Sequence, residues 1–151
     1  MANRVRQVYL DHIATTPLHP EVRDEMKTFL DRVFGNPMSL HSFGEEPRQA
    51  MEESRKRVAD LIHGDPREII FASCGTEANN MAIKGIALAY EKRGRHIITS
   101  RVEHSSVLHS CRTLENQGFR VTYLPVDRHG MVDPNDVAKS LSPDTVLVSM
   151  M

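Results

Sequence analysis

Short apolar runs alternate with amphipathic segments throughout residues 65–151 of this sequence. The apolar runs are predicted as strands at 68–73, 96–100, 120–126 and 145–151. The segments between them carry apolar residues at helical spacing and are predicted as helices at 77–90, 105–117 and 133–141. Because parallel neighbouring strands need a crossover connection, this alternation indicates βαβ units. We therefore expect an α/β fold with a mainly parallel sheet and helices on both faces.

The first 64 residues have a different pattern, with two predicted helices and no strand alternation. The first helix begins near Pro20, a residue suited to a first helical turn, and ends before the Gly35-Asn36-Pro37 turn. The second runs over about 46–63 and stops at Gly64. We expect residues 1–64 to form an N-terminal helical arm and residues 65–151 to form the βαβ part of one incomplete domain.

Composition excludes several classes of protein. The chain has 40% hydrophobic and 26% charged residues and a formal net charge of -1, which is typical of a folded globular protein. This balance indicates neither a nucleic-acid partner nor a membrane partner. Two cysteines and no apolar signal segment favour a reducing compartment, so we expect a cytoplasmic protein.

The segment 71–80, Phe-Ala-Ser-Cys-Gly-Thr-Glu-Ala-Asn-Asn, is the first candidate site. It is predicted to lead from a strand through a tight turn into a helix, where free backbone N–H groups and the helix dipole favour an anion. Gly75 would let a phosphate approach the backbone, and the Thr76 hydroxyl would add a donor. A capped turn without a ligand explains the same residues equally well.

His104 is the second candidate, at the carboxyl end of the predicted strand 96–100. An imidazole at this place would stack on a flat cofactor ring or transfer a proton, although a histidine that only starts a helix is the simpler alternative. The two candidate loops follow neighbouring strands and should converge on one crevice. No metal site is expected, because His104 and His109 are on different helix faces and the two cysteines lack CxxC spacing.

Together these residues resemble the cysteine desulfurases of the NifS/IscS kind, within the class V group of fold-type I pyridoxal-phosphate enzymes. The matching stretches are 8–17, 34–37, 65–71, 74–80, 83–85 and 98–104. The resemblance covers essentially the whole chain and implies the N-terminal half of such an enzyme, part of its cofactor-binding large domain.

The resemblance implies roles for individual residues. Gly75 and Thr76 match positions that hold the phosphate of pyridoxal 5'-phosphate, and His104 matches the histidine that stacks on its ring and assists proton transfer. Ala14, Thr15 and Asn36 match segments at the substrate side of the pocket or the dimer edge. The Schiff-base lysine, the aspartate on the pyridine nitrogen and the persulfide cysteine of the family have no match here, so non-covalent contacts alone are expected and the chain by itself is predicted to be inactive.

The implied activity is conversion of L-cysteine to L-alanine, with transfer of sulfur to an acceptor protein for iron–sulfur cluster or thiocofactor synthesis. A second polypeptide, the C-terminal half, would supply the missing groups in a homodimer or heterotetramer. Two alternatives stay open: a truncated, non-catalytic remnant or partner-binding relative, and another class V activity such as selenocysteine lyase.

Overall fold

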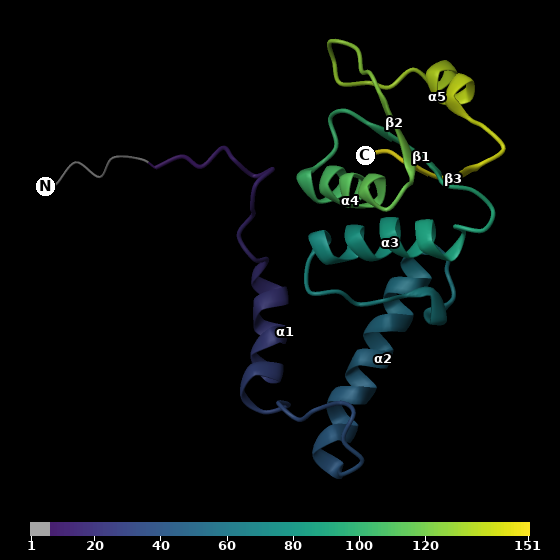
Figure 1. The fold of residues 1–151 in the computed structure, drawn as a ribbon. Coiled ribbons are helices and arrows are strands. Elements are labelled where there is room, and N and C mark those ends of the chain that lie inside the picture. The colour runs from purple at the N-terminus through teal and green to yellow at the C-terminus, as the bar shows by residue number, and fades with distance from the viewer. Residues whose placement is uncertain (1–6) are drawn as a thin grey trace, which may run out of the picture. The chain divides into compact units, whose positions relative to one another are not determined.

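The computed structural model describes residues 7–151, which divide into two compact units with their boundary between Ile70 and Phe71. Figure 1 follows the chain through both units, from the helices of the first to the α/β layers of the second. No helix in this part of the chain has the length and apolar character needed to cross a lipid bilayer.

The first unit contains two long helices, α1 (Pro20–Asp31) and α2 (Ser42–Ile62). Pro20 occupies the first turn of α1, as predicted from its lack of an N–H group. Helix α2 begins at Ser42, earlier than the predicted 46, and contains Pro47. It ends at His63, which takes the left-handed conformation (φ 56°), while the N–H of the following Gly64 donates to Ala59 O at 2.8 Å. The residue that stops the helix is therefore His63 and not the predicted glycine.

The strand predicted at 68–73 is wrong. Pro66–Glu68 forms a short 3-10 helix, η1, and no strand follows it before α3. A capping box holds this turn, since the Asp65 side chain accepts from the N–H of Arg67 and the Glu68 carboxylate accepts from the N–H of Asp65 at 2.9 Å. The carbonyl of Ile69 accepts from the Arg55 guanidinium of α2, so this backbone group bonds to a side chain and not to a strand ladder.

The second unit has a three-stranded parallel sheet. Its elements are α3 (Gly75–Ala89), β1 (His96–Ser100), α4 (Ser105–Asn116), β2 (Arg120–Leu124), α5 (Pro134–Ser140) and β3 (Thr145–Ser149). The strand order is β2-β1-β3, with Ile98 paired to Thr122 on one side and to Val148 on the other. These elements confirm the predicted parallel α/β fold; β1 has its predicted bounds, whereas β2 and β3 end two residues earlier than predicted.

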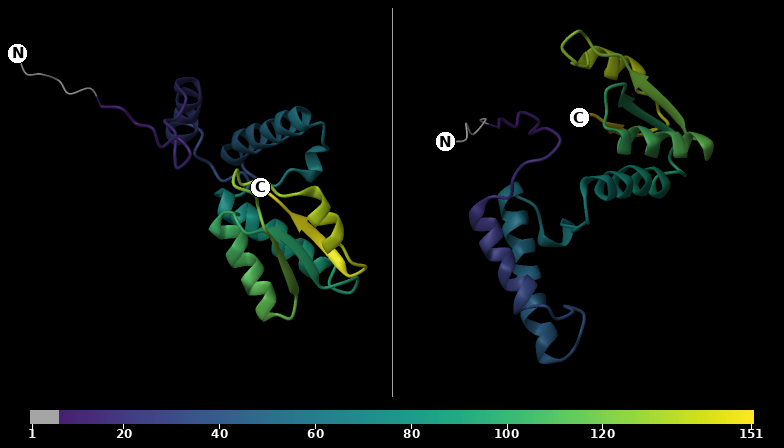
Figure 2. Two further views of the ribbon diagram at one scale, coloured as in Figure 1. Left: turned by 90° about the horizontal axis from the view of Figure 1, so that it is seen from above. Right: turned by 90° about the vertical axis from the view of Figure 1, so that its left-hand side faces the viewer.

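Helices cover both faces of the sheet. The chain moves from β1 to β2 on one side and then returns across β1 to β3, so two right-handed crossovers place α4 and α5 on opposite faces. Figure 2 shows this arrangement within the second unit, with α5 on one side of the strands and α4 on the other. Helix α3 packs beside α4.

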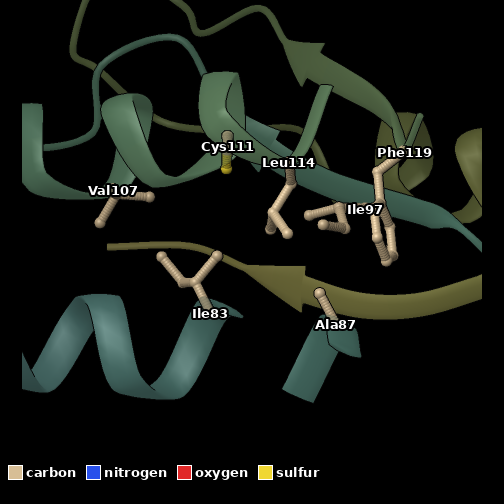
Figure 3. Close-up of a cluster of buried hydrophobic side chains, with 7 residues drawn as sticks. All are labelled: Ile83, Ala87, Ile97, Val107, Cys111, Leu114 and Phe119. Carbon is tan, nitrogen blue, oxygen red and sulfur yellow. The ribbon is translucent and has the colours of Figure 1, made fainter. Parts of the chain in front are cut away.

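The core of the second unit lies between α3, α4 and β1. Its buried side chains are Ile83, Ala87, Ile97, Val107, Cys111, Leu114 and Phe119. Figure 3 shows the α4 side chains directed toward Ile83 and Ala87 of α3. Helix α4 ends in a Schellman motif, in which Gly118 (φ +89°) permits the turn and the Phe119 N–H donates to Leu114 O at 3.0 Å. This motif brings Phe119 into the core and starts β2.

Candidate functional site

The strand order reverses between β1 and β3, and the candidate site lies at the carboxyl ends of these strands. Ligands of open α/β sheets bind outside such a switch point. Glu103 lies there with only 8% of its surface exposed. Its Oε1 accepts from the Ser100 hydroxyl at 2.9 Å and from the Met151 N–H at 2.8 Å. This carboxylate therefore ties together the segments that leave β1 and β3.

The first turn of α3 presents the candidate anion site. Cys74 is the N-cap, Gly75 and Thr76 open the helix, and all three are exposed. An added Cβ at Gly75 would meet no atom within 4 Å, so this side of the turn is open. The N–H groups of a helix first turn have no acceptor within the helix and are suited to an anion.

Hydrogen bonds at this turn lower the pKa of two acidic side chains, Cys74 and Glu77. The backbone N–H of Glu77, together with the Ser73 hydroxyl and the N–H of Thr76, holds the pKa of the Cys74 thiol below its usual value. The Ser73 N–H donates to the Glu77 carboxylate at 2.6 Å and lowers the pKa of that group also. This helix end thus stabilises anions, although the Glu77 carboxylate opposes any second negative charge beside it.

His104 is the N-cap of α4, and its ring is exposed. Its Nδ1 accepts from the Ser106 N–H at 3.1 Å and lies 2.8 Å from the Ser106 hydroxyl. Within residues 7–151 no group bonds to Nε2. The ring is therefore fixed on one side and available to a ligand on the other.

A hydrogen bond joins the two candidate loops. The Asn79 Nδ2 of α3 donates to the Ser106 Oγ of α4 at 2.9 Å. Because α3 and α4 pack side by side and begin at the same end (Figure 1), the bond holds the first turn of α3 near His104. Gly75, Thr76 and His104 therefore occupy one end of the second unit, at the carboxyl edge of the sheet.

The weaker candidates lie in the first unit. Ala14 and Thr15 belong to an exposed turn, in which both N–H groups donate to Asp11 O. Asn36 is exposed, and its side chain accepts from the Met38 N–H at 2.9 Å, which stabilises the turn between α1 and α2. The contacts of these residues are those of turn formation.

Sequence reasoning did not identify three residues of this site: Asn79, Glu103 and Ser106. Ser106 stands two residues after a helix N-cap, where its N–H needs a side-chain acceptor, and this position was a usable signal. Asn79 gave no such signal, because its partner Ser106 is 27 residues away, and neither did Glu103, whose bond to the Met151 N–H spans 48 residues. Among residues 7–151 no cluster of three or more histidine, cysteine or acidic side chains is placed to hold a metal ion.

A parallel sheet with a helix start and a histidine at its switch point is the arrangement of the α/β class of proteins that bind cofactors at this edge. Residues 8–151 match the sequence profile of the family described as Aminotransferase class-V. The chain belongs to this family.

Cysteine desulfurases are among the proteins most similar to this chain. The cysteine desulfurase IscS of Dictyoglomus turgidum is 58% identical over 146 residues, which are 97% of this chain and 37% of the relative. Human cysteine desulfurase is 51% identical over 148 residues, 97% of this chain and 32% of the relative. The chain thus spans about a third of the length of these relatives.

Solved structures agree with the fold. A NifS-like protein superposes with a TM-score of 0.87 at 42% identity, over 91% of this chain and 38% of the other. A structure described as SspA in complex with cysteine gives a TM-score of 0.87 at 36% identity, over 94% of this chain and 41% of the other. The predicted resemblance to NifS/IscS-type cysteine desulfurases is confirmed, and with it the fold-type I architecture.

Proposed function

We propose that this chain provides the phosphate-binding turn and the stacking histidine of a pyridoxal 5'-phosphate-dependent cysteine desulfurase. The hydrogen bond between Asn79 and Ser106 carries the proposal, because it holds an anion-stabilising helix end and an exposed imidazole at one sheet edge. The solved relative described as a complex with cysteine supports an amino-acid substrate. The reaction would convert L-cysteine to L-alanine and pass sulfur to an acceptor protein.

The residues present fit this cofactor. Gly75 leaves open space where a phosphate would approach, and the Gly75 N–H and the Thr76 hydroxyl would bind its oxygens. The His104 ring would cover the cofactor ring, while Nε2 would hold or deliver a proton. When bound, pyridoxal phosphate acts as an electron sink for the amino-acid substrate. The covalent lysine, the ring-nitrogen aspartate and the sulfur-carrying cysteine would come from parts of the enzyme outside these 151 residues.

The activity test mixes the chain with pyridoxal phosphate and L-cysteine, with and without a polypeptide that supplies the remaining part of a cysteine desulfurase. We expect alanine and sulfide in the combined sample and none with the chain alone. In the combined sample His104→Ala should lower turnover by about 10²-fold or more, as for loss of a general acid–base group. Product from the chain alone would contradict the proposed division of the site, and an inactive combination would favour a non-catalytic relative.

The phosphate-binding turn has a separate test. Gly75→Asp places a carboxylate in the first turn of α3, where the helix dipole tolerates it but a phosphate is repelled. We expect pyridoxal phosphate affinity, measured by equilibrium dialysis, to fall at least about tenfold, equivalent to ~1.4 kcal/mol. Gly85→Asp is the matched control, since it adds the same charge at another exposed position of α3 whose Cβ also meets no atom within 4 Å. Equal affinities for the two variants would place the phosphate elsewhere.

A further inference from the structure

We infer that Ser106 and Asn79 hold the His104 imidazole in the tautomer that carries its proton on Nε2, so that Nε2 meets a ligand as a hydrogen-bond donor. Both are positioning residues that act through His104. The inference stands on hydrogen-bond geometry, and it rests on the proposed function only for the nature of the ligand.

The backbone contact decides which nitrogen carries the proton. The Ser106 N–H lies 3.1 Å from the Nδ1 of His104, and an amide N–H only donates. Nδ1 must therefore present its lone pair. In a neutral imidazole the proton then lies on the other nitrogen, Nε2.

The Ser106 side chain reinforces this choice. Its Oγ lies 2.8 Å from the same Nδ1, and because Nδ1 is an acceptor, the hydroxyl must donate. A hydroxyl that donates its only hydrogen can still accept, and Asn79 Nδ2 donates to it at 2.9 Å. The opposite orientation of the Asn79 amide would take the hydroxyl hydrogen away from His104. One directed chain from α3 to α4 is thus consistent with every contact.

Burial of Ser106 restricts the movement of this series of hydrogen bonds. Ser106 is only 6% exposed, and Ser110, one turn later in α4, donates to the Ser106 carbonyl at 2.7 Å. A proton on Nδ1 would break the hydrogen bonds that this nitrogen accepts from the Ser106 N–H and the Ser106 hydroxyl. His104 therefore meets a ligand through Nε2–H, which suits an acceptor such as a phenolate or carboxylate oxygen.

The test reads the proton position directly. Protein labelled with ¹⁵N at histidine is sedimented and studied by magic-angle-spinning NMR near pH 8 without cofactor, so that self-association does not interfere. The signals of His104 are identified among the 8 histidines by their loss in His104→Gln. We expect an unprotonated Nδ1 and a protonated Nε2. A proton on Nδ1 in the unmodified chain would overturn the inference, whatever the variants do.

Paired variants test the two positioning residues. Ser106→Ala and Asn79→Asp should raise the Nδ1-protonated population at least about twofold, the lower end of coupling within one hydrogen-bonded network. In Asn79→Asp the carboxylate accepts the Ser106 hydroxyl hydrogen and leaves a lone pair facing Nδ1. Ser105→Ala and Asn80→Asp are the matched controls and should leave the spectrum unchanged, and Ser106→Thr, which keeps the hydroxyl, should behave as the unmodified chain.

Unchanged spectra for Ser106→Ala and Asn79→Asp would overturn the role of these residues. Because no cofactor is present, a failure of cofactor binding in the dialysis experiment would leave this result intact. The two outcomes therefore separate the tautomer from the proposed function.

Discussion

His96 is fully buried at the amino end of β1 and connects all three strands. Its Nδ1 lies 2.7 Å from the hydroxyl of Thr145 in β3, and its Nε2 lies 2.9 Å from the hydroxyl of Thr122 in β2. Burial, and then the charge of Arg120, lowers the pKa of this imidazole, while Asp144 opposes the shift. The folded protein thus favours the neutral form of this ring, which forms part of a hydroxyl network.

This burial predicts a pH dependence of stability. Because the folded protein disfavours imidazolium, the unfolded chain binds the proton more readily, and His96 stabilises the fold fully only above the ordinary histidine pKa of about 6.5. As the pH falls below that value, the free energy of unfolding should decrease, by at most about 1.4 kcal/mol per pH unit from this group. Urea unfolding from pH 8 to pH 5 measures the effect.

The control is His96→Asn, which should be less stable at pH 8 but should show a smaller loss on acidification. Parallel curves for the two proteins would show that another group causes the pH dependence.

At the scale of elements, α4 contributes more side chains to the core of the second unit than any other element. It contributes Val107, Cys111 and Leu114 to the core and ends in the turn that buries Phe119. The Cys111 thiol is fully buried, and this burial raises its pKa to about 11, so Cys111 is a packed core residue. The same helix places His104 at its first turn, so core packing fixes the position of the candidate site.

Shortening one core side chain should therefore weaken the second unit. Leu114→Ala removes a fully buried side chain and should lower the free energy of unfolding by ~2–5 kcal/mol. Leu88→Ala, at a position of α3 that is 51% exposed, is the matched control and should change it by no more than about 0.5 kcal/mol. Denaturant titration followed by circular dichroism compares them, and equal losses would contradict the assigned core.

At the scale of the whole chain, much apolar surface is exposed. Helix α1 buries none of its residues, and its apolar side chains Val22, Met26, Phe29 and Leu30 are all exposed. In α2, Leu61 is 80% exposed. Monomeric proteins rarely leave such apolar surfaces uncovered, because burial of apolar area is the main favourable contribution to association.

We therefore expect the 151-residue chain alone to associate or to be poorly soluble, and a polypeptide that completes the enzyme to improve its solubility. Sedimentation velocity over a range of concentrations measures this, with Leu30→Glu as a variant that should weaken association. A stable monomer at all concentrations would show that these exposed apolar side chains do not drive association.

The sequence by itself was sufficient for the fold class and for the local elements of the second unit. The apolar runs that became β1, β2 and β3 alternate with amphipathic helices, and such periodicity is a local property. The same holds for Gly75 and Thr76, whose place at a helix start follows from the neighbouring residues. The motifs were enough to identify the family.

The tertiary structure decided the rest, because the relevant contacts join residues far apart in the chain. Residues 68–73 have the apolar pattern of a strand, yet the Asp65–Glu68 capping box and the Arg55 contact with the Ile69 carbonyl form a turn there. Asn79 and Ser106 are 27 residues apart, so no local pattern could show their hydrogen bond. A hydrogen bond depends on positions in space, and packing of α3 against α4 alone brought these two side chains together.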